Sequence, residues 1–458
     1  MGTCFVCDSK IHENISYNED VTLSIKERDR LGKVFRTDKV KFKLTMPIIH
    51  IYEEVNLFKL HLSVSACVLP GIDPRSMLNK ECQDNLLCLN KDSLYLVGLF
   101  DGHGIDGLRV VEFVKDYMKS YFTKNTAGFI SGPSESLTYM ITECDKKLRS
   151  STSGIDCSVS GTTAVVMIIS DVIHVASVGD SRAILAMVGS VDPNFIPGKR
   201  YVEPNREIYP LRLTIDQRPN IKEELERIKK AGGKVQQLSN ENGVKIGPYR
   251  VWKKTGTLPG LAMSRSIGDA IGKEIGVIST PMCNSFMFDK STDLFLVIAS
   301  DGIWDVMNCT EVINFIDKFR PLCKKNPEPV SFPVKAENTT VAHLIAEEAR
   351  VRWMEICQDE DVMIDDISVV VVELKFLELF SEIPGGARQN VDVNTSVVSI
   401  TDSGRLISSK GDPVRGSFVP AREVARRRID PKRGSYVYEN TKIDYESYPD
   451  LLDIPFSK

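Results

Sequence analysis

Three short strings constrain this chain more than any other feature: LFDGHG at 99–104, SVGDSRAIL at 177–185 and IASDGIWDV at 298–306. In each string an apolar run adjoins an Asp–Gly or Gly–Asp pair. Apolar runs of this length are typical of buried strands, and glycine allows a tight turn beside the aspartate. A fourth string, DDISVVVVEL at 365–374, places carboxylates before the apolar run. We therefore expect four strand ends to bring carboxylates to one site.

Clustered carboxylates repel one another unless a cation lies between them, so the pattern predicts a site for divalent metal. Oxygen ligands favour Mg²⁺ or Mn²⁺ over Zn²⁺. The six histidines show no zinc-type spacing: they are His12, His50, His61, His103, His174 and His343. A pair of such metals suits the hydrolysis of a phosphate ester. His103 directly follows Asp101–Gly102, where it could protonate the leaving alkoxide.

Composition narrows the class of protein. The chain has 458 residues and a formal net charge of −4, which gives no reason to expect a nucleic-acid partner. Its eleven cysteines form an odd set without paired spacing, and no secretory signal opens the sequence. We therefore expect reduced thiols in an intracellular, cytoplasmic protein, with a monomer favoured. No run of 18 apolar residues is present, so no membrane span is expected.

The chain divides by composition into three parts. Residues 1–58 are mostly polar and are expected to form an N-terminal extension. Residues 59–377 alternate strands, turns and helices and are expected to form one folded domain, with its first strand at 59–69. Residues 378–458, including a basic stretch at 405–433, are expected to form a flexible or docked tail. Two polar segments at 189–210 and 321–340 are expected to be surface loops.

Two helices are predicted from periodicity and capping. The apolar spacing at 106–122 predicts a helix with Asp106 as its cap. The segment 220–231 predicts a second helix, with Asn220 and Glu223 as a capping pair and Gly232–Gly233 as its stop.

The strings together resemble, in order, the motifs of the metal-dependent protein serine/threonine phosphatases of type 2C. The resemblance covers residues 60–374, and PGLAMSRSIGD at 259–269 is nearly diagnostic by itself. The matching strings are CQDNLL (82–87), LFDGHG, SGTTA (160–164), SVGDSR, LTIDQRP (213–219), AGGKV (231–235), PGLAMSRSIGD, IASDGIWDV and DDISVVVV.

The resemblance implies an α+β fold, a four-layer αββα sandwich in which helices flank two central antiparallel β-sheets. It implies hydrolysis of phosphoserine and phosphothreonine in proteins by water activated at two Mg²⁺ or Mn²⁺ ions. Carried over by position, the metal-site carboxylates are Asp84, Asp101, Asp301 and Asp365, and the carbonyl of Gly102 is a further ligand. The family can hold a third, weaker metal where this chain has Asp180 and Asp305, and its proposed general acid falls on His103.

Two departures from the family pattern concern the first acidic motif. Gln83 stands where the family often has glutamate, although the neighbouring Asp84 is the direct ligand. An arginine that grips the substrate phosphate commonly precedes this motif. Here the nearby cations are Lys80, the better register match, and Arg75. A lysine gives a point contact in place of a bidentate clamp.

Two further segments have a functional and a structural interpretation each. Residues 234–258 lie where the family carries a flap, and are either a basic, aromatic substrate contact or a solvated hairpin with Trp252 packed on the core.

At the N-terminus, Gly2 suits N-myristoylation except that Val6 replaces the preferred Ser or Thr, and Cys4 and Cys7 suit palmitoylation. Eight Lys/Arg against three Asp/Glu at 26–43 suit a contact with acidic lipid, which favours a membrane-associated protein over a simple disordered start.

Three functions compete. An active phosphatase is favoured because all four primary carboxylates and His103 are present. The same fold could serve instead as a catalytically dead scaffold, which Gln83, the missing clamp arginine and the long ends favour. A hydrolase of small phosphates is the third reading. The tail could also fold over the active site, or dock a partner through its basic stretch.

Overall fold

The computed structural model describes residues 47–73, 78–150, 152–189, 207–240, 242–323, 339–356 and 364–377, together with four two-residue strands. The chain forms two compact units, of which the second comprises residues 191–201 and 378–444. Within the second unit, β19 (Ser399–Ile400) pairs with β20 (Leu406–Ile407), and β21 (Arg428–Ile429) with β22 (Tyr436–Val437). The predictions for Gly2, Cys4, Cys7 and Arg75 concern residues outside the described ranges, as does the basic stretch of the tail apart from the strands β20 and β21.

One sheet of the first unit has six antiparallel strands, in the order β1-β2-β18-β17-β10-β11. Its last strand along the chain, β18, lies between β2 and β17 and pairs with both. The bounds are β1 (Ile49–Asn56), β2 (Leu60–Leu69), β10 (Arg182–Val188), β11 (Ile208–Arg212), β17 (Asp293–Ala299) and β18 (Ile367–Phe376). A small pair, β3 (Ile72–Asp73) and β4 (Leu78–Asn79), follows β2.

The second sheet has seven strands, in the order β15-β7-β6-β8-β9-β16, with β5 paired to β6. Its pairings are antiparallel as well. The bounds are β5 (Asp84–Lys91), β6 (Leu94–His103), β7 (Gly161–Thr162), β8 (Ala164–Ile169), β9 (Val172–Val178), β15 (Ile267–Gly268) and β16 (Met282–Met287).

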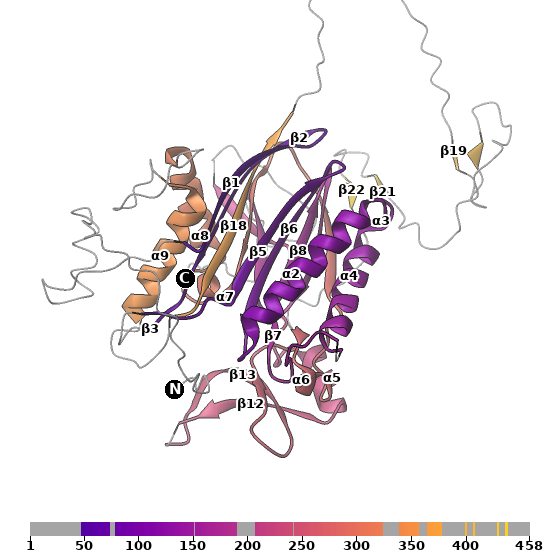
Figure 1. Ribbon diagram of the computed structural model, residues 1–458. Helices are drawn as coiled ribbons and strands as arrows, with labels where there is room; N and C mark the ends of the chain where they lie inside the picture. The colour runs from indigo at the N-terminus through magenta and orange to yellow at the C-terminus, as the bar shows by residue number, and fades with distance from the viewer. Residues whose placement is uncertain are drawn as a thin grey trace, which may run out of the picture. The chain divides into compact units, whose positions relative to one another are not determined.

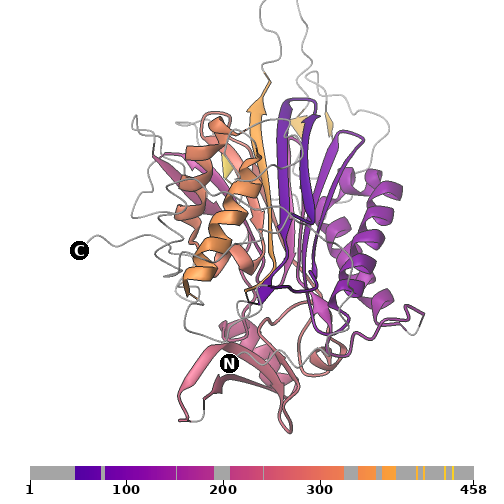
Figure 2. The same ribbon diagram turned by 60° about the vertical axis from the view of Figure 1, so that its left-hand side comes forward.

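Helices cover each sheet (Figures 1 and 2). The seven-stranded sheet packs against α2 (Gly107–Lys124) and α4 (Pro133–Leu148), with α3 (Thr126–Ser131) beside them. The six-stranded sheet packs against α8 (Cys309–Phe319) and α9 (Val341–Ile356). No helix within the described ranges combines the length and the apolar character needed to cross a bilayer.

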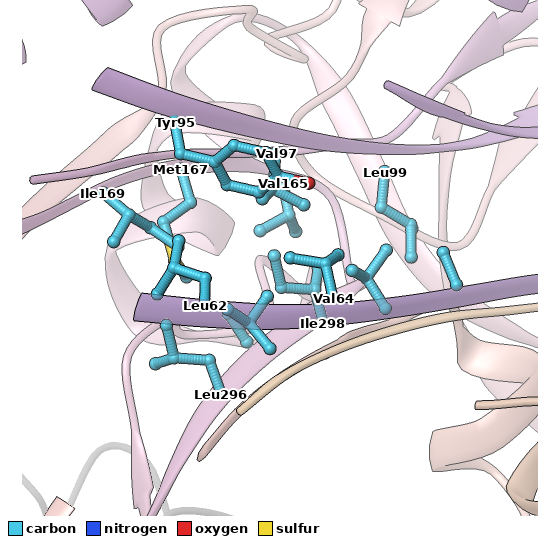
Figure 3. Packing of buried hydrophobic residues seen from close by; sticks show 14 of the residues in the cluster. Leu62, Val64, Tyr95, Val97, Leu99, Val165, Met167, Ile169, Leu296 and Ile298 are labelled. Carbon is cyan, nitrogen blue, oxygen red and sulfur yellow. The ribbon is translucent and has the colours of Figure 1, made fainter. Parts of the chain in front are cut away.

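The two sheets share one core between them (Figure 3). Leu62, Val64, Leu296 and Ile298 of the six-stranded sheet face Tyr95 and other residues of β6 and β8. The run of valines in β18 follows from its position: Val370 and Val372 lie in this core, while Val369 and Val371 pack toward the helices. A strand buried on both faces needs apolar residues at every position.

The segment expected to be a flap forms its own small sheet beyond one end of the two large sheets (Figure 1). It consists of β12 (Gly233–Ser239), β13 (Lys245–Lys253) and β14 (Pro259–Leu261). The Trp252 ring packs close to Gly260, and its indole N–H donates to the carbonyl of Gln236 at 2.9 Å. The tryptophan is therefore held by the hairpin itself. Helix α5 (Lys222–Lys230) precedes the hairpin and α6 (Ala270–Lys273) follows it.

The mixed architecture of antiparallel sheets and helices confirms the expected fold class. The predicted helix at 106–122 forms as α2, which Asp106 precedes without a side-chain capping bond. The helix predicted at 220–231 forms as α5, but its N-cap is Ile221. The expected Asn220 cap is displaced because Leu225 N–H already bonds to the carbonyl of Ile221.

The six-stranded sheet begins before the boundary drawn at residue 58. Strand β1 pairs with β2 over its whole length, from Ile49 opposite Val68 to Asn56 opposite His61. Its outer residues are polar and partly exposed because β1 is an edge strand, so its composition resembles that of an extension.

Candidate active site

Strand ends from both sheets bring the predicted carboxylates to one edge of the fold. Asp84, the first residue of β5, lies directly opposite Asp101 of β6 in the antiparallel register. Asp301 begins the short helix α7 (Asp301–Trp304), which directly follows β17 and Ser300. Asp180 and Asp365 each stand two residues before a strand, β10 and β18. Because β10, β17 and β18 are neighbours in one sheet, their ends meet at the same edge.

Burial and mutual repulsion perturb these carboxyl groups. The side chain of Asp84 is 4% exposed, and neither of its carboxylate oxygens has a hydrogen-bond partner. Burial, followed by the negative charge of Asp366, raises the pKa of Asp84 to about 8. Burial and neighbouring carboxylates likewise raise the pKa of Asp101 and of Asp301 well above their usual range. The site therefore disfavours its own ionised form unless a positive charge enters it.

Asp180 and Asp305 form a second group beside the first. Asp180 is buried, and its Oδ1 atom has no hydrogen-bond partner. Burial raises its pKa, although the charge of Arg218 partly opposes the rise. The Asp305 side chain is 48% exposed, and partial desolvation of its carboxyl, followed by the negative charge of Asp180, raises its pKa to about 6. The carboxyl groups of Asp180 and Asp305 thus interact electrostatically with Arg218, and Asp180 also acts on Asp305.

The two adjacent aspartates before β18 have different surroundings. Asp366 is buried, and its two oxygens accept backbone N–H bonds from Gly71 at 2.6 Å and from Gln83 at 2.9 Å. The Asp365 side chain is 48% exposed, and its Oδ1 atom accepts a bond from Lys80 Nζ at 2.8 Å. Asp366 therefore links the backbones of Gly71 and Gln83, while Asp365 faces the carboxylate site. Lys80, expected to contact substrate phosphate, is engaged with Asp365.

Gly102 is placed where only glycine fits. Its N–H donates to the carbonyl of Gln83 at 3.1 Å. A Cβ atom there would lie 2.6 Å from that carbonyl oxygen and 2.7 Å from Val111 Cγ2. The side chain of Gln83 turns away from the carboxylates, because its Nε2 donates to the carbonyl of Gly104 at 3.0 Å. Gln83 thus holds Gly104, the residue that directly follows His103 at the end of β6.

His103 is oriented by a carboxylate 166 residues away in the sequence. Its Nε2 bonds to both oxygens of Asp269, at 3.0 and 2.9 Å, whereas the buried Nδ1 has no partner. Burial alone would lower the pKa of His103, but the charge and hydrogen bond of Asp269 outweigh it and raise the pKa. The arrangement favours a protonated ring whose Nδ1–H is available.

Asp269 is fixed in turn, and sequence reasoning did not identify its role. It has a left-handed backbone at φ 52°, and its Oδ2 accepts a bond from Ser266 Oγ at 2.6 Å. The buried Asp145 accepts the N–H of the preceding Gly268 at 2.8 Å. The sequence does mark Asp269, because it is the last residue of the string PGLAMSRSIGD. No local pattern, however, pairs this aspartate with His103.

The oxygen atoms of the site bear on whether it can hold a divalent metal. Within the described ranges, no group of three or more His, Cys, Asp or Glu side chains is arranged to hold a metal ion as the side chains stand. The chemistry of the site nevertheless fits a hard cation. Its donors are carboxylate and carbonyl oxygens, and the buried oxygens Oδ1 and Oδ2 of Asp84 and Oδ1 of Asp180 lack hydrogen-bond partners. Burial is the main cause of the raised pKa of Asp84 and of Asp180, and a bound cation would offset it.

Comparison with known proteins gives one consistent match. Residues 73–349 match the family model described as Protein phosphatase 2C, and Asp365 lies beyond the end of this match. The chain is 34% identical over 286 residues to Probable protein phosphatase 2C 61 of Arabidopsis thaliana, covering 61% of this chain and 75% of that protein. It is 32% identical over 281 residues to Probable protein phosphatase 2C 48 of Oryza sativa subsp. japonica, covering 57% and 74%.

A solved structure gives a matching fold. The serine-threonine phosphatase 2C from Toxoplasma gondii superposes with a TM-score of 0.53 and 18% identity, covering 72% of this chain and all of that one. At this identity the likeness concerns the fold alone.

Proposed function

Because this chain belongs to the protein phosphatase 2C family and is a protein serine/threonine phosphatase, we propose that its reaction uses two Mg²⁺ or Mn²⁺ ions. Phosphoserine and phosphothreonine in other proteins are the substrates, and the edge where the strand ends meet is the active site. The observation that carries the proposal is the convergence of Asp84, Asp101 and Asp301 from two sheets, with pKa values raised by burial and by one another.

The residues that would hold the metals are the four carboxylates Asp84, Asp101, Asp301 and Asp365, with the carbonyl oxygen of Gly102. Asp180 and Asp305 would hold a third, weaker ion. When bound, the metals supply an activated water and neutralise charge on the phosphoryl group. Bound cations would also offset the burial and mutual repulsion that raise the pKa of these carboxyl groups.

His103 is proposed as the general acid. The bond from Nε2 to Asp269 fixes the ring and leaves Nδ1 as the atom that holds the transferable proton. The charge and hydrogen bond of Asp269 raise the pKa of His103 and so favour the ring form that carries this proton. The leaving serine or threonine oxygen takes this proton as its bond to phosphorus breaks. Asp269 acts through His103 and is a positioning residue.

The test is hydrolysis of a phosphothreonine peptide by the full chain with Mn²⁺, with Mg²⁺ and with EDTA. The Asp301→Asn variant should lose at least about 100-fold in kcat, because it removes a charged metal ligand. Asp116→Asn, on an exposed position of α2, is the matched control and should retain activity. Circular dichroism would show that both variants fold.

Other outcomes would favour the alternatives. If the folded chain hydrolysed no substrate with either metal, the scaffold function would replace this proposal. If p-nitrophenyl phosphate were hydrolysed while phosphopeptides were not, a hydrolase of small phosphates would replace it. Metal-dependent peptide turnover that Asp301→Asn did not reduce would contradict the assigned metal site.

A further inference from the structure

Within the part of the chain that the structure describes, the cation that the sequence predicts for the substrate phosphate is already paired. Lys80 is engaged with Asp365 at 2.8 Å, and Arg75 lies outside the described residues. Arg218, in the string LTIDQRP, extends into the acidic site from a different direction. We propose that Arg218 is the residue that contacts the substrate phosphate in this chain. The inference rests on the proposed function and assigns a binding role within it.

The backbone next to Arg218 is held beside Gly179, the residue that precedes Asp180. Gln217 N–H donates to the carbonyl of Gly179 at 2.9 Å, and the Gln217 side chain accepts from Gly179 N–H at 2.7 Å. On the other side, the N–H and the hydroxyl of Ser264 both donate to the Gln217 carbonyl, at 2.8 and 2.9 Å. Arg218 therefore starts from a backbone position that the segments of Gly179 and Ser264 hold in place.

The guanidinium of Arg218 has donors to spare. Its closest carboxylate approaches are 3.8 Å to Asp216 and 4.0 Å to Asp305, both longer than a hydrogen bond. Its Nε atom is buried without a partner. The side chain is 35% exposed, so it reaches the open part of the site. An incoming anion would meet a fixed cation whose N–H groups are not already used.

Neutralising Asp216 does not require Arg218. Asp216 is 7% exposed and accepts bonds from Arg182 at 3.1 and 2.7 Å and from Arg212 at 2.6 Å. Burial alone would raise its pKa, but Arg182 and Arg212 outweigh burial and lower the pKa of Asp216. Two arginines thus already compensate this carboxylate by direct hydrogen bonds, while the charge of Arg218 acts on Asp180, Asp216 and Asp305 together.

A phosphate monoester matches this geometry. Guanidinium presents a planar fork of donors that pairs with two phosphate oxygens, which a lysine cannot do. Arg218 lies beside the expected metal carboxylates, so the same phosphoryl group could be bound from both sides. The arginine clamp that the first acidic motif lacks would then be supplied from the segment before α5.

The test compares Arg218→Met and Arg218→Lys with the wild-type full chain. Binding of inorganic phosphate is measured by calorimetry on Mn²⁺-loaded protein, and KM and kcat are measured on a phosphothreonine peptide. Arg218→Met should weaken phosphate binding and raise KM by about tenfold or more, the usual effect of losing a charge-assisted hydrogen bond. Arg218→Lys should weaken binding at least about threefold, since the charge remains but the fork is lost.

The controls separate binding from folding and from metal affinity. The midpoint of a Mn²⁺ titration, followed by thermal unfolding, should change less than about twofold in either variant. Lys146→Met removes one positive charge from an exposed pair on α4 and should leave phosphate affinity unchanged. If Arg218→Met does not fold, the comparison rests on Arg218→Lys.

Three results would overturn the inference: unchanged phosphate affinity in Arg218→Lys, unchanged affinity in a folded Arg218→Met, or loss of Mn²⁺ binding in step with phosphate binding. The last would mean that Arg218 only supports the carboxylates. If the wild-type chain bound phosphate through Arg218 but hydrolysed no peptide, the proposed function would fail while this inference would be supported.

Discussion

Replacing Asp84 by asparagine should stabilise the metal-free protein at neutral pH. The Asp84 carboxyl is 4% exposed, lacks hydrogen-bond partners, and has a pKa raised from 3.8 to about 8. Between these two values the folded state holds a proton that the unfolded chain has released. The folded state therefore loses stability as the pH rises from about 4 to about 8. An asparagine at this position carries no such cost.

The magnitude follows from the pKa shift. pH 7 lies roughly three pH units above 3.8, the ordinary pKa of the aspartate carboxyl. Each of these units lowers the stability of the folded state by about 1.36 kcal/mol. The upper bound is about 4 kcal/mol. Since Asp84 shares its repulsion with Asp101 and Asp366, removing one charge should recover about 2–4 kcal/mol. For a domain of this size that corresponds to a rise in Tm of about 3–6 °C.

The assay is thermal unfolding in EDTA from pH 4.5 to pH 8. The gain of Asp84→Asn over wild type should grow with pH and should shrink or reverse when Mn²⁺ is added, because the metal stabilises the wild-type site. Asp216→Asn is the matched control with the opposite sign. Its buried carboxylate is paired with two arginines and has a lowered pKa, so the substitution should destabilise the protein throughout this pH range. Equal stability of Asp84→Asn and wild type at pH 8 in EDTA would refute the reasoning.

Two further predictions concern the loop that ends β6. His103→Gln should reduce kcat on a phosphothreonine peptide by about 100-fold or more, but should reduce hydrolysis of p-nitrophenyl phosphate much less, because that leaving group needs no proton; equal losses would argue against a general acid. Gly102→Ala should destabilise the fold by about 1–3 kcal/mol in urea unfolding, because the new Cβ would lie 2.6 Å from the Gln83 carbonyl oxygen; an unchanged midpoint would show that the loop yields easily.

The strand ends could be predicted because their signals are local. Apolar runs that adjoin Asp–Gly pairs placed Asp101 and Asp301 at the ends of buried segments, and the structure brings them together with Asp84. The choice of Asp365 over Asp366 came from the register of a motif. The structure supplies a physical reason, since both oxygens of Asp366 already accept backbone N–H groups.

Contacts between distant segments could not be predicted. The bond between His103 and Asp269 depends on the pairing of β7 with both β6 and β15, which no local pattern reveals. Lys80 was expected to face the substrate, yet its partner Asp365 is 285 residues away. Strand β1 was overlooked because its polar outer face hides its pairing with β2. In each case the missing information is a contact between segments that are separate in the sequence.

The position of β18 has a consequence for the synthesis of this protein. The hairpin of β1 and β2 joins the rest of its sheet only through β18, which is made some 300 residues later. A nascent chain must keep the apolar edge of β2 unpaired until that last strand leaves the ribosome. Asp365 is synthesised just before the same strand. A chain that stops earlier therefore has neither the complete six-stranded sheet nor the complete acidic site. Partial products should therefore be inactive and should be recognised readily by chaperones and proteases.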